Sequence, residues 1–163
     1  MLVVADSSPL IYLSRVGVPH ILPTLFGDVV VPRAVWQEVA ERRPSAAGIR
    51  ALHEAAWLRV VDTPSSSADL GLDPGETAAI LLAESLHADL LLIDERVGRA
   101  VAQERRLAVR GTLGVLVQAR ESSVLPALKP VLDALGAGGF RIAPAPVRQA
   151  LEHVGEVDHI GGP

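Results

Sequence analysis

At 163 residues, 49% of them hydrophobic and 21% charged, the chain is long enough for one domain with a buried core and too apolar for an intrinsically disordered protein. It contains no cysteine, which excludes disulfides, thiolate metal sites and thiol nucleophiles. Its net charge of −4 argues against binding nucleic acid by charge alone, and its two Phe, two Trp and one Tyr are too few for an extended base-stacking platform.

The chain begins with MLVVADSSPL, which has no basic region and only a short apolar run, so it is not typical of a signal peptide. No later segment reaches the ~18 uninterrupted apolar residues of a membrane span, because acids such as Glu84, Asp89 and Asp94 interrupt the longest runs. We therefore expect a soluble, cytoplasmic protein.

Short apolar runs and helical patterns alternate along the first two thirds of the chain. The runs predict strands at 2–5, 28–31, 57–61, 90–93 and 107–109. Caps, prolines and apolar spacing predict helices at 6–16, at 19–26 (broken by Pro23), and at 32–42, 45–56, 74–86, 96–106 and 112–121, with a loop at 63–71. This alternation predicts an α/β fold with a parallel sheet and helices on both faces.

The pattern weakens beyond residue 125, where helices are predicted at 127–135 and 146–154. No internal repeat and no boundary between domains is visible. We therefore expect a single domain over residues 1–150, followed in 151–163 by the end of a helix and a flexible C-terminal tail.

Two acids follow strands directly. Asp6 comes after the strand at 2–5, and Asp94 comes after the strand at 90–93. Either residue alone is most simply a helix cap. Because sites in parallel α/β sheets form at the carboxyl ends of the strands, two such acids on neighbouring strands would instead lie close together.

Two further acids occur on predicted helices. Glu38 lies beside the buried stripe of VPRAVWQEVA and points either to solvent or into a polar pocket. Glu76 stands three residues after Asp73 in LDPGETAAILLA, which is the spacing of a capping box. A helix start also favours an anion, so a structural role and a role in a site are compatible for Glu76.

Four gathered carboxylates would repel each other unless a cation lay among them. Oxygen ligands without cysteine or a well-spaced histidine pair select Mg²⁺ or Mn²⁺. Such an ion binds phosphate readily, so the implied chemistry is phosphodiester cleavage by a metal-activated water. Arginines follow the acids closely, among them Arg96 and Arg99, and they fit either phosphate contacts or a solvated helix face.

Five segments resemble, in order and spacing, the PIN domain family, and the likeness covers roughly residues 1–140. They are VVADSSPLIYL, VPRAVWQEV, LDPGETAAILLA, ADLLLIDERVGR and VRGTLGVL. Within this family, the chain resembles bacterial and archaeal PIN-like proteins related to the toxin ribonucleases of toxin–antitoxin pairs.

This resemblance implies a three-layer α/β/α sandwich and a Mg²⁺- or Mn²⁺-dependent ribonuclease site. The catalytic and metal-binding acids would be Asp6, Glu38, Glu76 and Asp94, with Glu95 as a further metal ligand. Ser7 and Thr112 match supporting hydroxyl residues, although an N-cap explains each equally well. Arg96 and Arg99 would contact the phosphates of RNA.

Other functions remain open at this stage. A non-catalytic PIN-like module that binds RNA or protein is compatible with the acidic net charge. A doubly wound phosphohydrolase with Asp6 as its nucleophile is less compatible, because Ser8 stands where such enzymes often have a second Asp. If the protein is a toxin, an antitoxin would cover the acidic groove or a hydrophobic surface beside it, and the high hydrophobic fraction favours a homodimer.

Overall fold

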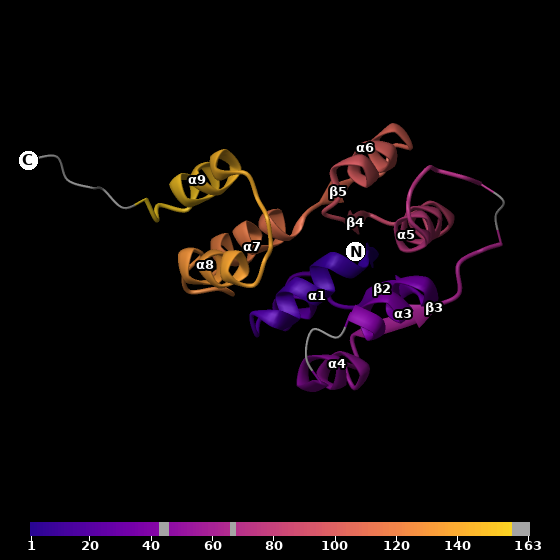
Figure 1. Cartoon of the computed structure of the whole chain (residues 1–163), viewed down its shortest axis with the longest axis horizontal. Coiled ribbons are helices and arrows are strands. Elements are labelled where there is room, and N and C mark those ends of the chain that lie inside the picture. Colours follow the sequence, from indigo (N-terminus) through magenta and orange to yellow (C-terminus); the bar gives the residue numbers. More distant parts are fainter. Residues whose placement is uncertain (43–45, 66–67, 158–163) are drawn as a thin grey trace, which may run out of the picture. The chain divides into compact units, whose positions relative to one another are not determined.

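The computed structural model describes residues 1–42, 46–65 and 68–157, and the chain forms two compact units, Met1–Thr112 and Leu113–Pro163 (Figure 1). The first unit contains the sheet and all the residues that sequence reasoning assigns to a site. Among the described residues, no helix is both long enough and apolar enough to cross a membrane.

Five parallel strands make up the sheet of the first unit, in the order β3-β2-β1-β4-β5. They are β1 (Val3–Ala5), β2 (Val29–Pro32), β3 (Leu58–Val61), β4 (Leu90–Leu92) and β5 (Val109–Arg110). Every residue of β1, β2 and β4 is buried, as expected for the central strands of a sheet covered on both faces.

The order of the strands creates a crevice between β1 and β4. From β1 the chain moves outward to β2 and β3, whereas from β4 it moves the opposite way to β5. Because crossovers between parallel strands are right-handed, the helices that follow β1 and β4 cover opposite faces of the sheet. The predicted fold class, an α/β/α sandwich around a parallel sheet, is confirmed, and ligands in such folds bind at this crevice.

The helices of the first unit connect these strands. They are α1 (Ser7–Arg15), α2 (Ile21–Phe26), α3 (Arg33–Arg42), α4 (Ala46–His53), α5 (Pro74–Ser85) and α6 (Arg96–Glu104). Helix α5 packs against β1, β2 and β4, which explains why its middle is apolar on nearly every side. Helix α3 packs against both α1 and α5, so residues on α3 and at the start of α5 come together.

Two local predictions were wrong. Pro23 does not break α2, because it is the third residue of that helix and the first-turn amides have no partner within the helix. Strand β5 begins at Val109 rather than at residue 107, because the turn after α6 uses Leu107. Arg106 is left-handed at φ +63°, and the Leu107 amide donates to the Ala102 carbonyl.

The second unit contains α8 (Lys129–Ala137), α9 (Pro144–His153) and α7 (Thr112–Glu121), which begins on the last residue of the first unit. Helices α8 and α9 each lie two residues or fewer from their predicted ranges. Glu156, which falls in the predicted tail, accepts hydrogen bonds from the Leu128 and Lys129 amides, each at 2.8 Å, and from Arg120 Nε at 2.8 Å. It therefore caps α8, whereas residues 158–163 lie outside the described residues.

Candidate functional site: an acidic cluster at the carboxyl edge

Asp6 extends β1 into the crevice beside β4. Its amide donates to the Leu92 carbonyl at 2.9 Å, and its side chain makes no capping bond to α1. The residue is 2% exposed, and its Oδ1 is buried with no hydrogen-bond partner among the described residues. Burial raises the pKa of this carboxyl to about 7, the carboxylates of Glu38, Glu76 and Asp73 add to the rise, and the Ser7 amide opposes it.

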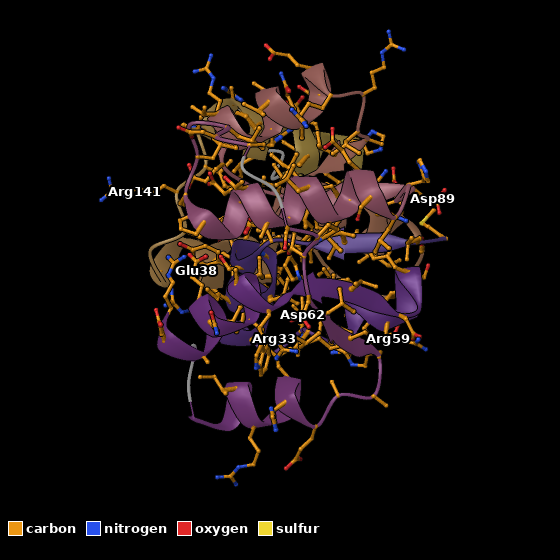
Figure 2. The ribbon with its side chains drawn as sticks, turned by 90° about the vertical axis from the view of Figure 1, so that its right-hand side faces the viewer. Arg33, Glu38, Arg59, Asp62, Asp89 and Arg141 are labelled. Atoms are coloured by element: carbon orange, nitrogen blue, oxygen red, sulfur yellow. The ribbon has the colours of Figure 1, made fainter. Side chains whose placement is uncertain are left out.

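Glu38 reaches the same place from α3. A Cβ atom on Gly75 would lie 2.5 Å from Glu38 Oε2, 3.6 Å from Asp73 Oδ1 and 3.7 Å from Asp6 Oδ1. Carboxyl oxygens from three elements therefore converge on one point, and the glycine leaves them room. The side chain of Glu38 is 29% exposed and pairs with Arg42 Nη1 at 3.4 Å, so it lies at the open margin of the cluster (Figure 2).

Glu76 combines a capping role with a place in the cluster. Its amide donates to Asp73 Oδ1 at 2.8 Å, and the Asp73 amide donates in return to the Glu76 carboxylate, which completes the predicted capping box. Even so, burial raises the pKa of Glu76 to about 7, with further contributions from Asp73, Glu95 and Glu38. The carboxylate also faces Gly98, where a Cβ atom would lie 3.7 Å from Glu76 Oε2.

Asp94 is held more firmly than Asp6. Its Oδ1 accepts from the Thr112 amide at 2.7 Å, and its Oδ2 accepts from the Thr112 hydroxyl at 2.6 Å. Burial raises the pKa of Asp94, whereas Thr112 and the neighbouring Arg99 guanidinium lower it. The Thr112 hydroxyl is thus used to orient Asp94.

The structure divides the predicted site residues into two groups. Asp6, Glu38 and Glu76 interact with one another and with Asp73, while the main influences on Asp94 are Thr112, Arg99 and Glu95. Glu95 acts on both Glu76 and Asp94 and so stands between the groups. Within the described part of the chain, no group of three or more His, Cys, Asp or Glu side chains is placed so that it could hold a metal ion.

The remaining predicted residues surround these groups. Ser7 is buried at the start of α1, and Glu95, Arg96 and Arg99 are exposed around the start of α6. Sequence reasoning missed the contributions of Asp73 and Gly75. The signal lay in the DPGE motif, where a glycine occupies the first turn of a helix although its backbone needs no left-handed conformation.

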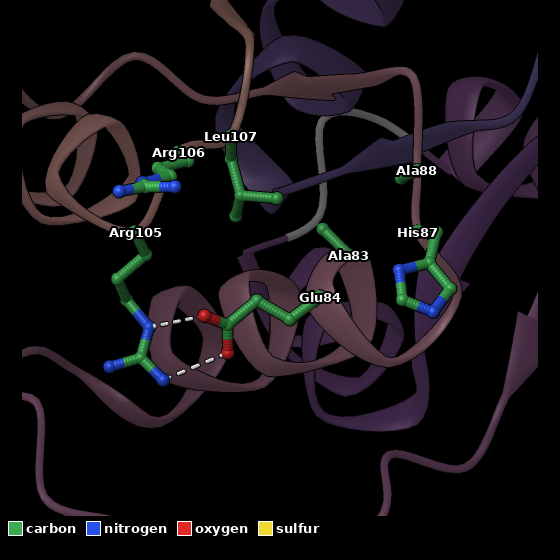
Figure 3. Close-up of a pocket in the computed structure, with 7 residues that line it drawn as sticks. All are labelled: Ala83, Glu84, His87, Ala88, Arg105, Arg106 and Leu107. Carbon is green, nitrogen blue, oxygen red and sulfur yellow. Dashed lines mark hydrogen bonds and ion pairs between the residues drawn. The ribbon is translucent and has the colours of Figure 1, made fainter.

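An open pocket of about 320 Å³ lies elsewhere, in the turns that precede β4 and β5 (Figure 3). Its rim carries His87, Arg106 and an ion pair between Arg105 and Glu84. In this pair Arg105 Nε donates to Glu84 Oε1 at 2.7 Å and Arg105 Nη2 donates to Glu84 Oε2 at 2.8 Å. No predicted site residue lines it, because these turns belong to the amino edge of the parallel sheet. It is therefore separate from the acidic cluster.

The donor chemistry of the acidic cluster suits a hard divalent cation, although no three of its described side chains are placed to hold one in this structure. Its donors are all oxygens, Asp6 Oδ1 is buried without a partner, and two of its carboxyls have a pKa of about 7 in the protein alone. The raised pKa values have two causes, which are first the burial of the carboxyls away from water and then the negative charge of the neighbouring acids. Arg42 and Arg99 lie at the margins and leave the centre unneutralised.

A parallel sheet with acids at its carboxyl edge defines an α/β domain with a candidate site at that edge. A family model described as a PIN domain matches residues 2–156, nearly the whole chain. The chain therefore belongs to the PIN domain family, which confirms the resemblance found in the sequence. Neither a curated protein nor a solved structure matches the chain significantly.

Proposed function

We propose that this protein is a divalent-metal-dependent ribonuclease whose site is the acidic cluster at the crevice between β1 and β4. The observation that carries the proposal is the buried Asp6 Oδ1, which has no hydrogen-bond partner in the described part of the chain and belongs to a carboxyl whose pKa the nearby Glu38 and Glu76 raise. Membership of a family with a nuclease-like fold supports the same activity.

The carboxylates would hold Mg²⁺ or Mn²⁺. Asp6 and Asp94 are the proposed central ligands, Glu38 and Glu76 complete the set or orient bound waters, and Glu95 is a further ligand. The bound ion would lower the pKa of a bound water, so that hydroxide becomes available near neutral pH to attack a phosphodiester. It would also stabilise negative charge on the phosphate. The same acids are the proposed catalytic residues.

Thr112 and Ser7 are proposed to support this site. Two hydrogen bonds from Thr112 fix the orientation of Asp94, and a fixed ligand loses less entropy when it binds. The Ser7 amide stabilises the charged form of Asp6. Each residue thereby favours the charged form of its carboxyl and opposes the rise in pKa that burial causes.

Arg96 and Arg99 are the proposed phosphate contacts. Both are exposed in α6, and the guanidinium of Arg99 is close enough to Asp94 to lower the pKa of that carboxyl. An arginine beside acidic ligands can bind a phosphate that also approaches the metal. The positive charge needed to bind RNA is thus concentrated at Arg96 and Arg99, which is compatible with the net charge of −4 for the whole chain.

The test is cleavage of RNA in the presence of Mn²⁺ by the wild type, Asp6→Asn and Asp94→Asn. We expect cleavage by the wild type and a loss of about 100-fold or more in each variant, since removal of one charged ligand abolishes a metal site. Equal activity in all three proteins would contradict the assignment.

A second candidate is a non-catalytic PIN-like module that binds RNA or protein. The hydrogen bonding of Asp94 favours it, because both carboxylate oxygens of Asp94 already accept hydrogen bonds from Thr112. Calorimetry with Mn²⁺ separates the two functions. A nuclease site should bind the ion and lose that binding in Asp6→Asn, whereas a non-catalytic module should bind RNA equally well with and without metal.

The proposal extends to partners. If the ribonuclease is the toxin of a toxin–antitoxin pair, a protein antitoxin would cover the acidic groove and suppress cleavage. A homodimer is proposed from the high hydrophobic fraction of the sequence. Growth on expression of the chain alone tests the first idea, and the mass of the protein in solution tests the second.

A further inference from the structure

A small pocket lies beside α3, away from the acidic cluster. It has a volume of about 230 Å³ and is built from α3, α4 and β3. Its lining residues are Arg33, Trp36, Leu52, His53, Leu58 and Val60. The volume is below the roughly 300–1,000 Å³ of ordinary small-molecule sites, so the pocket suits a group no larger than one planar ring system.

Two aromatic rings and an apolar floor give the pocket its chemistry. The rings of Trp36 and His53 are stacked, with centroids 5.8 Å apart and planes inclined by 27°. Leu52 is 1% exposed, and Leu58 and Val60 are half-buried. Paired aromatic rings above an apolar floor are the surface on which unpaired nucleobases stack.

Arg33 adds hydrogen-bond donors to the rim. Its Nε donates to Asp62 Oδ1 at 2.7 Å, and its terminal nitrogens have no partner in the described part of the chain (Figure 2). Arg33 directly follows β2 and Asp62 directly follows β3, so this rim belongs to the carboxyl edge of the sheet. A guanidinium there can bind a phosphate or the edge of a base.

The pocket and the acidic cluster lie on opposite sides of one helix. Trp36 and Glu38 are two residues apart in α3, which places them about 200° apart around an axis with 3.6 residues per turn. A helix is about 10 Å thick. A few nucleotides of single strand crossing α3 would therefore connect the two places, and the composition, which disfavours an extended aromatic platform, allows a single stacking position.

We infer that this pocket receives one unpaired base of the RNA strand whose backbone reaches the acidic cluster. The base stacks on the outer face of the Trp36–His53 ring pair, and Arg33 contacts the adjacent phosphate. The inference rests on the proposed function, because it assumes that the substrate is single-stranded RNA. It deepens that function by requiring an unpaired base near the scissile phosphate.

The experiment uses the fluorescence of Trp36. Trp57→Phe removes the other tryptophan, so that Trp36 is the only residue that emits when tryptophan is excited selectively over Tyr12. This protein is titrated in EDTA, where a metal-dependent nuclease cannot cleave, with a single-stranded oligoadenylate and with an abasic strand of equal charge. We expect saturable quenching by the oligoadenylate and none by the abasic strand. No quenching by either strand, or equal quenching by both, would overturn the inference.

Affinity measurements on variants provide the second arm. Trp36→Leu should weaken binding of the oligoadenylate about 5- to 100-fold, and Trp36→Phe should restore much of it. Arg33→Met has a matched control in Arg59→Met, because Arg59 is also exposed and also paired to an aspartate, Asp28, at 2.6 Å (Figure 2). Weaker binding in Arg33→Met alone supports the pocket, whereas equal losses in both variants contradict it.

The outcomes for the pocket and for the nuclease activity are separable. Cleavage of RNA with Mn²⁺ by a protein whose Trp36 does not respond to bases would leave the proposed function standing and overturn the pocket. Quenching of Trp36 without any cleavage would support the pocket and contradict the nuclease.

Discussion

Replacing Asp6 by Asn should stabilise the metal-free protein at pH 8. Burial and the nearby acids raise the pKa of Asp6 from 3.8 to about 7, so ionising it costs free energy in the folded state. A shift of one pKa unit corresponds to about 1.4 kcal/mol, which sets a ceiling of about 4 kcal/mol for this carboxyl. Because structural relaxation reduces such costs, we expect a gain of about 1–3 kcal/mol in the free energy of unfolding.

The sign of the pH dependence follows from proton binding. Between about pH 4 and pH 7 the folded protein holds a proton on Asp6 that the unfolded chain has lost. The stability of the metal-free wild type should therefore fall as the pH rises through this window. The fall should be smaller in Asp6→Asn, though not absent, because Glu76 also has a raised pKa of about 7.

The assay is urea unfolding followed by circular dichroism, in EDTA at pH 4.5 and pH 8 and then with Mn²⁺ at pH 8. Mn²⁺ should stabilise the wild type and leave Asp6→Asn unchanged. Asp28→Asn serves as the control, because Asp28 is exposed and paired with Arg59. A variant of Asp6 that is less stable than the wild type at pH 8, or one that Mn²⁺ still stabilises, would refute the reasoning.

Three further outcomes are expected. Thr112→Val removes the hydroxyl bond that lowers the pKa of Asp94, so the acidic limb of the pH profile for RNA cleavage should move to higher pH, while Thr112→Ser should keep it in place. Gly75→Ala places a Cβ atom 2.5 Å from Glu38 Oε2 and should weaken Mn²⁺ binding in calorimetry about ten-fold or more. The control is Gly136→Ala, another helix substitution, whose Cβ would have no atom within 4 Å and which should leave Mn²⁺ binding unchanged. Equal affinities of the two variants for Mn²⁺ would contradict this geometry. Glu156 has a lowered pKa because the Leu128 and Lys129 amides and Arg120 bind its carboxylate, so its contribution to stability should be lost as the pH falls below 4.5. Thermal melts should show Glu156→Gln less stable than the wild type at pH 7, and the exposed Glu152→Gln unchanged; similar melting temperatures for both variants would argue against the cap.

The sheet could be predicted because its physical signals are local. Leu90, Leu91, Leu92 and Ile93 form an uninterrupted apolar run bounded by Asp89 and Asp94, and such a run is typical of a parallel strand buried on both faces. Pro23 misled the prediction, because the penalty of proline depends on whether it falls in the first turn or deeper in a helix. The position of β5 depended on a left-handed Arg106, which no residue preference indicates.

The candidate site could be predicted only in outline. The strand order, which sequence does not specify, brings Asp6 beside β4, and the packing of α3 on α5 brings Glu38 to Gly75. The contacts that hold Asp94 depend on Thr112, 18 residues further along the chain. Capping explained Asp73 so fully that its charge, which raises the pKa of Asp6, was overlooked.

The most direct test of the acidic cluster is a crystal grown with Mn²⁺ and measured for anomalous scattering. The account predicts a Mn²⁺ peak about 2.0–2.2 Å from Asp6 Oδ1, with carboxylate oxygens of Glu38, Glu76 or Asp94 or their bound waters around it. A cluster without such a peak, in which Asp6 Oδ1 is bonded to protein groups alone, would contradict the account.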